Sequence, residues 1–251
     1  MSRRVVAWFA ATIVVLGLGG GLADNYLNAG GTGSSNPTSV VPVATLPTIA
    51  PNKPRLGTSM SDFMGVTPER GTAPAFTLTD PAGSRVSLAS LRHKVVVLSF
   101  FEPTCQDICP VIASELRYAS RDLGPAAAAE VAFVTVNADP LVTSLDATRS
   151  VGARSGLSVV ANWSFLTGSL PRLDGVWRSY GITVDVASGA VAHNDLIWFI
   201  SPSGRLAYRA TPFANEQRAN GTYTLAMSQR ARWGRGIAAY ASHLLPSSTS
   251  G

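Results

Sequence analysis

Two nearly continuous apolar runs, Val95–Phe101 and Val131–Val136, constrain the fold of this chain more than any other feature. Short runs rich in β-branched residues are typical of strands that are buried on both faces of a sheet. Between them, Ile112, Leu116 and Ala119 recur at helical spacing and share one face. Two strands joined by a helix pair in parallel, so the sequence predicts a βαβ unit at its centre.

The remaining segments extend this unit into a larger sheet. Pro110 suits the first turn of the central helix, and Gly124-Pro125 predicts its end. The other expected elements are a hairpin of 76–79 and 85–88, helices over 143–154 and 169–180, a third core strand at 196–200, a return strand at 205–209, and a final helix over 222–245. This order is typical of an α/β protein with a thioredoxin-like fold.

The N-terminus predicts export. Arg3 and Arg4 precede Val5–Ala23, an uncharged run close to the ~20 apolar residues of a membrane-spanning helix. We expect residues 1–24 to be a transmembrane anchor; a cleaved signal is the alternative, because Gly21-Leu22-Ala23 resembles a cleavage site. The arginines keep the N-terminus inside. An uncleaved chain is therefore a single-pass cell-membrane protein with its C-terminal domain on the extracytoplasmic side.

Composition sets the expected domain boundaries. Residues 25–62 are rich in Gly, Ser and Pro and are expected to form a linker, because such a stretch cannot bury enough apolar area to fold. The thioredoxin-like domain is then expected over residues 63–246, followed by a disordered tail at 247–251.

Charge and cysteine content narrow the function classes. The net charge of +5 comes from scattered arginines rather than a basic stripe, so a nucleic-acid partner is not expected. The only two cysteines, Cys105 and Cys109, are too few and too close for a disulfide-stapled fold. They therefore indicate a local site.

Cys105 and Cys109 lie where the first buried strand ends and the central helix begins. Ligands of open α/β sheets bind at the carboxyl ends of strands, and a helix N-terminus favours thiolate over thiol. Two thiolates there would form a soft clamp that suits Cu(I) or zinc. The spacing alone leaves three alternatives open, which are a redox pair, a metal clamp and a short structural disulfide.

Several segments together resemble the Sco (SenC-type) family. They are Ala73–Asp80, Lys94–Phe100, the C-x-x-x-C-P motif at 105–110, Asp139-Pro140, Phe165–Gly168, and His193 followed by Ser201–Arg205. The resemblance covers about residues 72–209. Members of this family are copper-binding, thioredoxin-like proteins linked to assembly of the dinuclear copper centre of cytochrome c oxidase.

The resemblance implies that Cys105, Cys109 and His193 bind copper, as Cu(I) or Cu(II). It assigns no catalytic residue, although the two cysteines would be the redox-active pair of an oxidoreductase. Three positions depart from the family's pattern: Gln106 replaces the usual proline, Glu102-Pro103 replaces a small and aromatic pair, and Asp139-Pro140 lacks the usual charged run after it. These departures bear on partner choice and affinity.

The three histidines have different expected roles. His93 is expected on the surface, and the helix dipole accounts for His243 near the end of the last helix. Thioredoxin-like topology places His193 beside the cysteine helix, where oxidoreductases of this fold usually carry a cis-proline that this chain lacks. That difference favours metal binding over thiol exchange. Asp195 could orient His193, but a solvated aspartate is expected.

The resulting expectation is a metallochaperone rather than an enzyme. Its expected partners are the copper-receiving subunit of a respiratory cytochrome c oxidase and a thiol reductant. An exported thiol:disulfide reductase acting on oxidase or other client cysteines is the alternative, and a redox sensor using the same cysteines is a third. A peroxidase of the peroxiredoxin type would carry its reactive cysteine in a different motif.

The apolar run Val5–Ala23 generates a first prediction. The native protein should fractionate with membranes and keep its N-terminus, because a run of this length is stable across a bilayer. Intact-mass measurement on the native protein checks this. A mass that begins at Asp24 would contradict the anchor and leave a soluble exported form.

Overall fold

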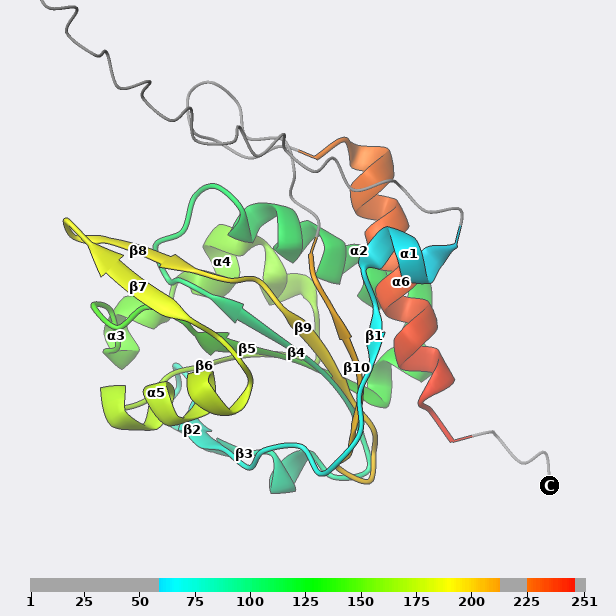
Figure 1. The fold of residues 1–251 in the computed structure, drawn as a ribbon, viewed down its shortest axis with the longest axis horizontal. Helices are drawn as coiled ribbons and strands as arrows, with labels where there is room; N and C mark the ends of the chain where they lie inside the picture. Colours follow the sequence, from blue (N-terminus) through cyan, green and yellow to red (C-terminus); the bar gives the residue numbers. More distant parts are fainter. Residues whose placement is uncertain (1–58, 213–224, 247–251) are drawn as a thin grey trace, which may run out of the picture. The chain divides into compact units, whose positions relative to one another are not determined.

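The computed structural model describes residues 59–212 and 225–246, which form a mixed sheet with helices on both faces (Figure 1). The strand order is β1-β10-β9-β4-β5-β6. These strands are β1 (Thr67–Pro68), β10 (Leu206–Ala210), β9 (Ile197–Ile200), β4 (Val95–Phe101), β5 (Val131–Asn137) and β6 (Trp163–Leu166). All described residues belong to one compact unit, residues 51–251.

The predicted anchor (1–24), most of the predicted linker (25–62) and the predicted tail (247–251) lie outside the described residues. Within 59–212 and 225–246, none of the helices combines the length and the apolar character needed to cross a bilayer.

The central pair β4–β5 confirms the predicted βαβ unit. The two strands pair in parallel along their whole length, from Val95 opposite Val131 to Phe101 opposite Asn137. Strand β6 continues the parallel pairing on β5, and β9 adds antiparallel to the other side of β4. Parallel pairing brings the carboxyl ends of β4, β5 and β6 to one edge of the sheet, where the cysteine motif follows β4.

Strand β4 is apolar except for the buried Ser99, because its two faces supply two hydrophobic cores. One core receives Val95, Val97 and Phe101 and is covered by helices α2 (Cys109–Ala129) and α6 (Met227–His243). The other receives Val96, Leu98 and Phe100 and is covered by α5 (Leu170–Ser179) and the hairpin β2 (Thr77–Thr79)–β3 (Arg85–Ser87). Burial of each large side chain contributes about 1.5–3 kcal/mol relative to exposure. A strand of alternating polar and apolar residues would lose this contribution to one of the two cores.

Helix α2 runs past its predicted end. Gly124 has φ 70° and ψ 166°, which breaks the helix where Gly124-Pro125 predicts its end. A second helical segment then continues to Ala129. Proline is tolerated in the first turn of a helix, so Pro125 begins this second helical segment and does not end the helical region.

Several other elements differ from the sequence-based expectation. The helix expected over 143–154 is two short helices, α3 (Leu145–Thr148) and α4 (Val151–Ser155). Helix α1 (Met60–Met64) begins slightly before the expected start of the domain at residue 63. Strand β6 and edge strand β1 were not expected. The short 3-10 segments η1 (Ala89–Leu91) and η2 (Leu157–Val159) complete the described elements.

A hairpin outside the main sheet is the largest unexpected element. Strands β7 (Val184–Ala187) and β8 (Ala190–His193) form a separate two-stranded sheet that projects beyond the main one (Figure 1). Ser188 and Gly189 both have positive φ, 53° and 80°, as a two-residue hairpin turn requires. Most of this hairpin is exposed, so it lacks the apolar period that identifies buried strands.

Helices α2 and α6 approach closely at Gly234. A Cβ atom at this position would overlap the Cβ of Tyr118 and lie 3.0 Å from the backbone N of Ala119 and the backbone O of Glu115. Backbone atoms cannot move aside as a flexible side chain can. Glycine is therefore required for this approach.

Gly234→Ala should destabilise the protein by roughly 1–3 kcal/mol, because overpacking forces two packed helices apart. The free energy of unfolding from a urea titration measures this. Gly175→Ala in α5 is the matched control, because nothing lies within 4 Å of its added Cβ. This control should be stabilised by roughly 0.5–1 kcal/mol through helix propensity. Equal effects of the two substitutions would contradict the packing argument.

Candidate functional site

The predicted cysteines meet at the N-terminus of α2. Cys109 is the first residue of the helix, and Cys105 lies on the loop that leaves β4. The two form a disulfide with a Cα–Cα distance of 5.9 Å, within the range that a disulfide spans without backbone movement. The Cys109 N–H also lies 3.3 Å from Cys105 Sγ and donates toward it. The loop thus holds both sulfurs together at the sheet edge.

Asp107 shapes this loop. Its Oδ1 accepts a hydrogen bond from the N–H of Ile108 at 2.6 Å and lies 3.1 Å from Cys105 Sγ. When Cys105 is a thiol, its S–H can donate to this carboxylate. Arg154 of α4 donates to the backbone carbonyl of Pro103 and ties the loop to the neighbouring helix.

His193 is the last residue of β8, and its side chain is only 2% exposed. Its Nε2 lies 3.7 Å from Glu102 Oε1, and its Nδ1 lies 3.2 Å from the backbone carbonyl of Asn194. A proton on Nδ1 can be donated to this carbonyl, which leaves the lone pair on Nε2. The Asn194 side chain anchors the base of the hairpin, accepting from the Thr183 N–H at 2.8 Å and donating to the Gly181 carbonyl at 3.0 Å.

Glu102 connects the sulfurs with the imidazole. It lines a small cavity of about 30 Å³ together with Cys105 and Cys109, and its carboxylate contacts His193. The structure therefore brings all three predicted site residues to one edge of the sheet. With the disulfide closed, the described residues contain no set of three or more His, Cys, Asp or Glu side chains arranged to hold a metal ion.

Asp195 differs from the expectation of a solvated aspartate. Its side chain is 22% exposed, and its Oδ1 lies 3.7 Å from His193 Nδ1 with no hydrogen-bond partner in the described part of the chain. Burial raises the pKa of Asp195 to about 6, His193 lowers it and Asp107 raises it. Asp195 thus lies beside the imidazole it could orient, and the expectation of a solvated group was wrong.

The pKa of Glu102 is also raised, first by burial and then by Asp139, Asp107 and Asp195, while His193 opposes the shift. Two carboxyl groups, Glu102 and Asp195, thus lie beside a single imidazole, and two more act on Glu102. An arrangement with this excess of negative charge favours a bound cation over an anion.

Glu115 is a buried carboxyl that sequence reasoning missed. It is fully buried on α2, and neither of its carboxyl oxygens has a hydrogen-bond partner among the described residues. Burial raises its pKa well above the ordinary value, Arg230 opposes the shift and Asp195 adds to it. The signal was present, because Glu115 falls between Ile112 and Ala119 on the predicted apolar face.

A family model for SCO1/SenC proteins matches residues 65–225, which is more than half of the chain. The chain belongs to the SCO1/SenC family. Among curated proteins, no sequence matches this SCO1/SenC chain.

Solved structures confirm the thioredoxin-like α/β fold. A SCO1/SenC family lipoprotein from Bacillus anthracis matches with a TM-score of 0.56 and 19% identity, over 72% of this chain and 98% of that chain. Apo Sco1 from Thermus thermophilus matches with a TM-score of 0.55 and 22% identity, over 70% and 93%. Copper-bound ScoI from Bradyrhizobium japonicum matches with a TM-score of 0.53 and 21% identity, over 70% and 100%.

The other two histidines of this SCO1/SenC domain lie where they were predicted. His93 is exposed beside the entry to β4, and His243 is exposed in the last turn of α6. Neither contributes to the cysteine edge of the sheet.

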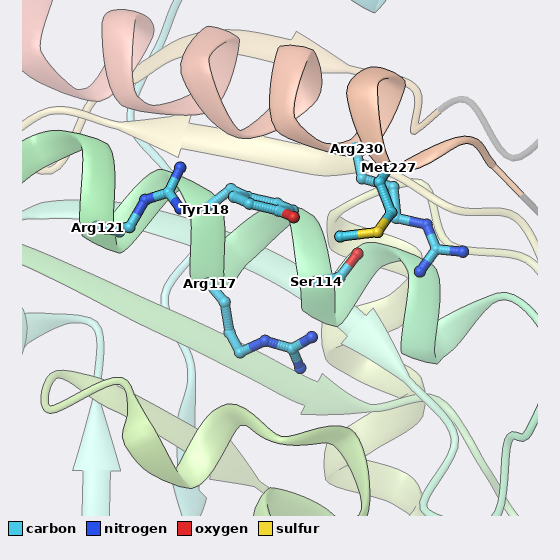
Figure 2. A pocket seen from close by; sticks show the side chains of 6 residues that line it. All are labelled: Ser114, Arg117, Tyr118, Arg121, Met227 and Arg230. Carbon is cyan, nitrogen blue, oxygen red and sulfur yellow. The ribbon is translucent and has the colours of Figure 1, made fainter.

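A larger cavity of about 330 Å³ lies away from the cysteines, between α2 and the first turns of α6 (Figure 2). It is lined by Ser114, Arg117, Tyr118, Arg121, Met227 and Arg230. Each guanidinium already has a partner within the protein: Arg117 donates to the Ser155 carbonyl, Arg230 to the Leu225 carbonyl, and Arg121 to Asp122. Of these contacts, only that of Arg117 joins α2 to a neighbouring element, α4. No predicted site residue lines the cavity.

Proposed function

We propose that this chain binds copper through Cys105, Cys109 and His193 and delivers it to the copper-receiving subunit of a respiratory cytochrome c oxidase. The observation that carries the proposal is the convergence of both sulfurs and a buried imidazole on one sheet edge, joined through Glu102. Two thiolates and one imidazole are a soft donor set that suits Cu(I) and also accepts Cu(II). Membership of the SCO1/SenC family and the likeness to a copper-bound ScoI support the same metal.

Copper is cargo in this proposal, and the chain's own residues prepare the site. The disulfide first accepts two electrons and two protons from a dithiol reductant, which becomes a disulfide in turn. The resulting thiols lose their protons when they bind the metal, and the N-terminus of α2 favours that loss. A proton held on His193 Nδ1 by the Asn194 carbonyl keeps Nε2 free to coordinate.

The proposal places this chemistry at the extracytoplasmic face of the cell membrane. Val5–Ala23 would span the bilayer once, and the linker would let the folded domain reach a client on the same membrane. A tether of this reach suits delivery to a client on the same membrane.

Thiol:disulfide exchange is a second candidate function, because Cys105 and Cys109 form a disulfide at a helix N-terminus. This arrangement suits a redox-active pair that reduces oxidase or other client cysteines. The sulfurs cannot serve both roles at the same moment, since the disulfide lacks the two thiolates that a metal needs.

The ligand set can be tested by single substitutions in the full-length protein. Cys105→Ser, Cys109→Ser and His193→Ala should each weaken copper binding by more than about 100-fold, since each removes a direct ligand rather than an outer partner. Competition against a chromogenic chelator measures Cu(I) affinity, and the thiolate-to-copper charge-transfer absorption of a Cu(II) form should vanish in both serine variants. His243→Ala is the matched control and should bind like the parent. Parental affinity in His193→Ala would leave only a two-cysteine site.

Chaperone and reductase functions can be separated on one preparation. The reduced, copper-loaded protein should transfer copper to an apo oxidase subunit, while the copper-free protein should reduce a generic disulfide slowly compared with a dithiol oxidoreductase. The reason is that a histidine lies where exchange enzymes of this fold place a proline. Turnover close to the reference enzyme, together with normal oxidase copper loading in cells that carry His193→Ala, would rule out the chaperone function.

A further inference from the structure

Glu102 lies between the two parts of the proposed metal site. It is the first residue after β4, on the loop that carries Cys105, and its backbone carbonyl accepts the Cys105 N–H at 3.3 Å. Its side chain lines the small cavity beside both cysteines, and its Oε1 lies 3.7 Å from His193 Nε2. No other residue of this cavity's lining also contacts the imidazole through an ion pair among the described residues.

The carboxylate of Glu102 is not committed to another partner. A separation of 3.7 Å is too long for a hydrogen bond, and in the part of the chain that the structure describes no side-chain hydrogen bond to Glu102 is present. The side chain is 17% exposed, so it is largely sheltered from water. It also faces the nitrogen that the Asn194 carbonyl leaves free, which is the nitrogen a metal would take.

The charges around Glu102 favour a cation. Burial raises the pKa of Glu102 most, His193 lowers it, and repulsion from Asp139, Asp107 and Asp195 raises it further. Arg154, which also lines the cavity, donates to the Pro103 carbonyl instead. A doubly charged ion in contact with Glu102 would relieve more of this repulsion than a singly charged one.

We propose that Glu102 supplies a carboxylate oxygen as a fourth ligand and thereby makes the site select a divalent ion over Cu(I). The inference rests on the proposed function, because it adds one donor to Cys105, Cys109 and His193. Carboxylate is a hard donor that contributes to Cu(II), Zn²⁺ and Co²⁺ sites but little to Cu(I), which thiolate and imidazole already satisfy. Glu102 would thus determine whether the reduced site binds a monovalent or a divalent ion more tightly.

The test compares Cu(I) and divalent affinities in the reduced full-length protein without oxygen. Co²⁺ serves as the divalent probe because it does not oxidise the thiolates, and its visible absorption reports the ligand set. Glu102→Gln should weaken Co²⁺ binding by more than about 100-fold, because it removes a direct ligand rather than an outer partner, and it should leave the Cu(I) dissociation constant unchanged. The Co²⁺ spectrum and the electron paramagnetic resonance spectrum of a Cu(II) form should change with it.

Two further variants control for charge and folding. Asp185→Asn removes one negative charge from the exposed strand β7 of the hairpin that carries His193, and it should change neither affinity. Glu102→Asp keeps the carboxylate and should retain more Co²⁺ affinity than Glu102→Gln. If Glu102→Gln does not fold by circular dichroism, Glu102→Asp against Glu102→Ser makes the same comparison.

The outcomes separate this inference from the proposed function. Unchanged Co²⁺ affinity in Glu102→Gln, or equal weakening of Co²⁺ and Cu(I), would overturn the fourth ligand while cysteine-dependent copper binding by the parent stands. A parent protein that binds no Co²⁺ would also overturn it. Copper binding that survives Cys105→Ser and Cys109→Ser would overturn the proposed function itself.

Discussion

The parallel pairing of β4 with β5 is the contact on which the site depends. Both strands are buried on both faces, so the connection between them must cross back over the sheet as helix α2. The first turn of α2 therefore lies at the carboxyl edge of β4, and the chain can reach it only through the short loop that carries Glu102 and Cys105. Burial in two cores thus decides where the sulfurs lie, and the close approach of α2 to α6 at Gly234 keeps that helix in place.

The sequence predicts this half of the site because its signals are local. The apolar run of β4, the helical period after it and Pro110 together specify strand, loop and helix start, and the cysteines fall at the junction. The hairpin that carries His193 is different. Its strands β7 and β8 are mostly exposed, so no burial period identifies them, and Ser188-Gly189 is the only local turn signal. The contact of His193 with Glu102 joins residues far apart in the chain and could not be derived from spacing.

The buried carboxyls show a second limit of sequence reasoning. Glu115 comes from α2, Asp195 from the segment before β9, and Arg230 from α6, so their mutual distances depend on the whole fold. Acidic residues are rarely buried without a partner, which made a solvated Asp195 the natural expectation. Raised pKa values mean that the folded state holds protons on these groups more tightly than the unfolded chain does. Their contribution to the free energy of unfolding therefore falls as pH rises above their ordinary pKa values.

The two halves of the site respond differently to oxidation. Cys105 and Cys109 exist as a disulfide or as two thiols, and their Cα distance of 5.9 Å allows either form without movement of the backbone. His193 is held by the hairpin and by the hydrogen bonds of Asn194 to Gly181 and Thr183, none of which involves sulfur. The hydrogen bonds that hold the hairpin of His193 therefore do not depend on the oxidation state of the sulfurs. On the proposed function, the reductant that opens the disulfide decides when the site can bind a metal. Reduction turns the disulfide into the two thiols that become the sulfur ligands.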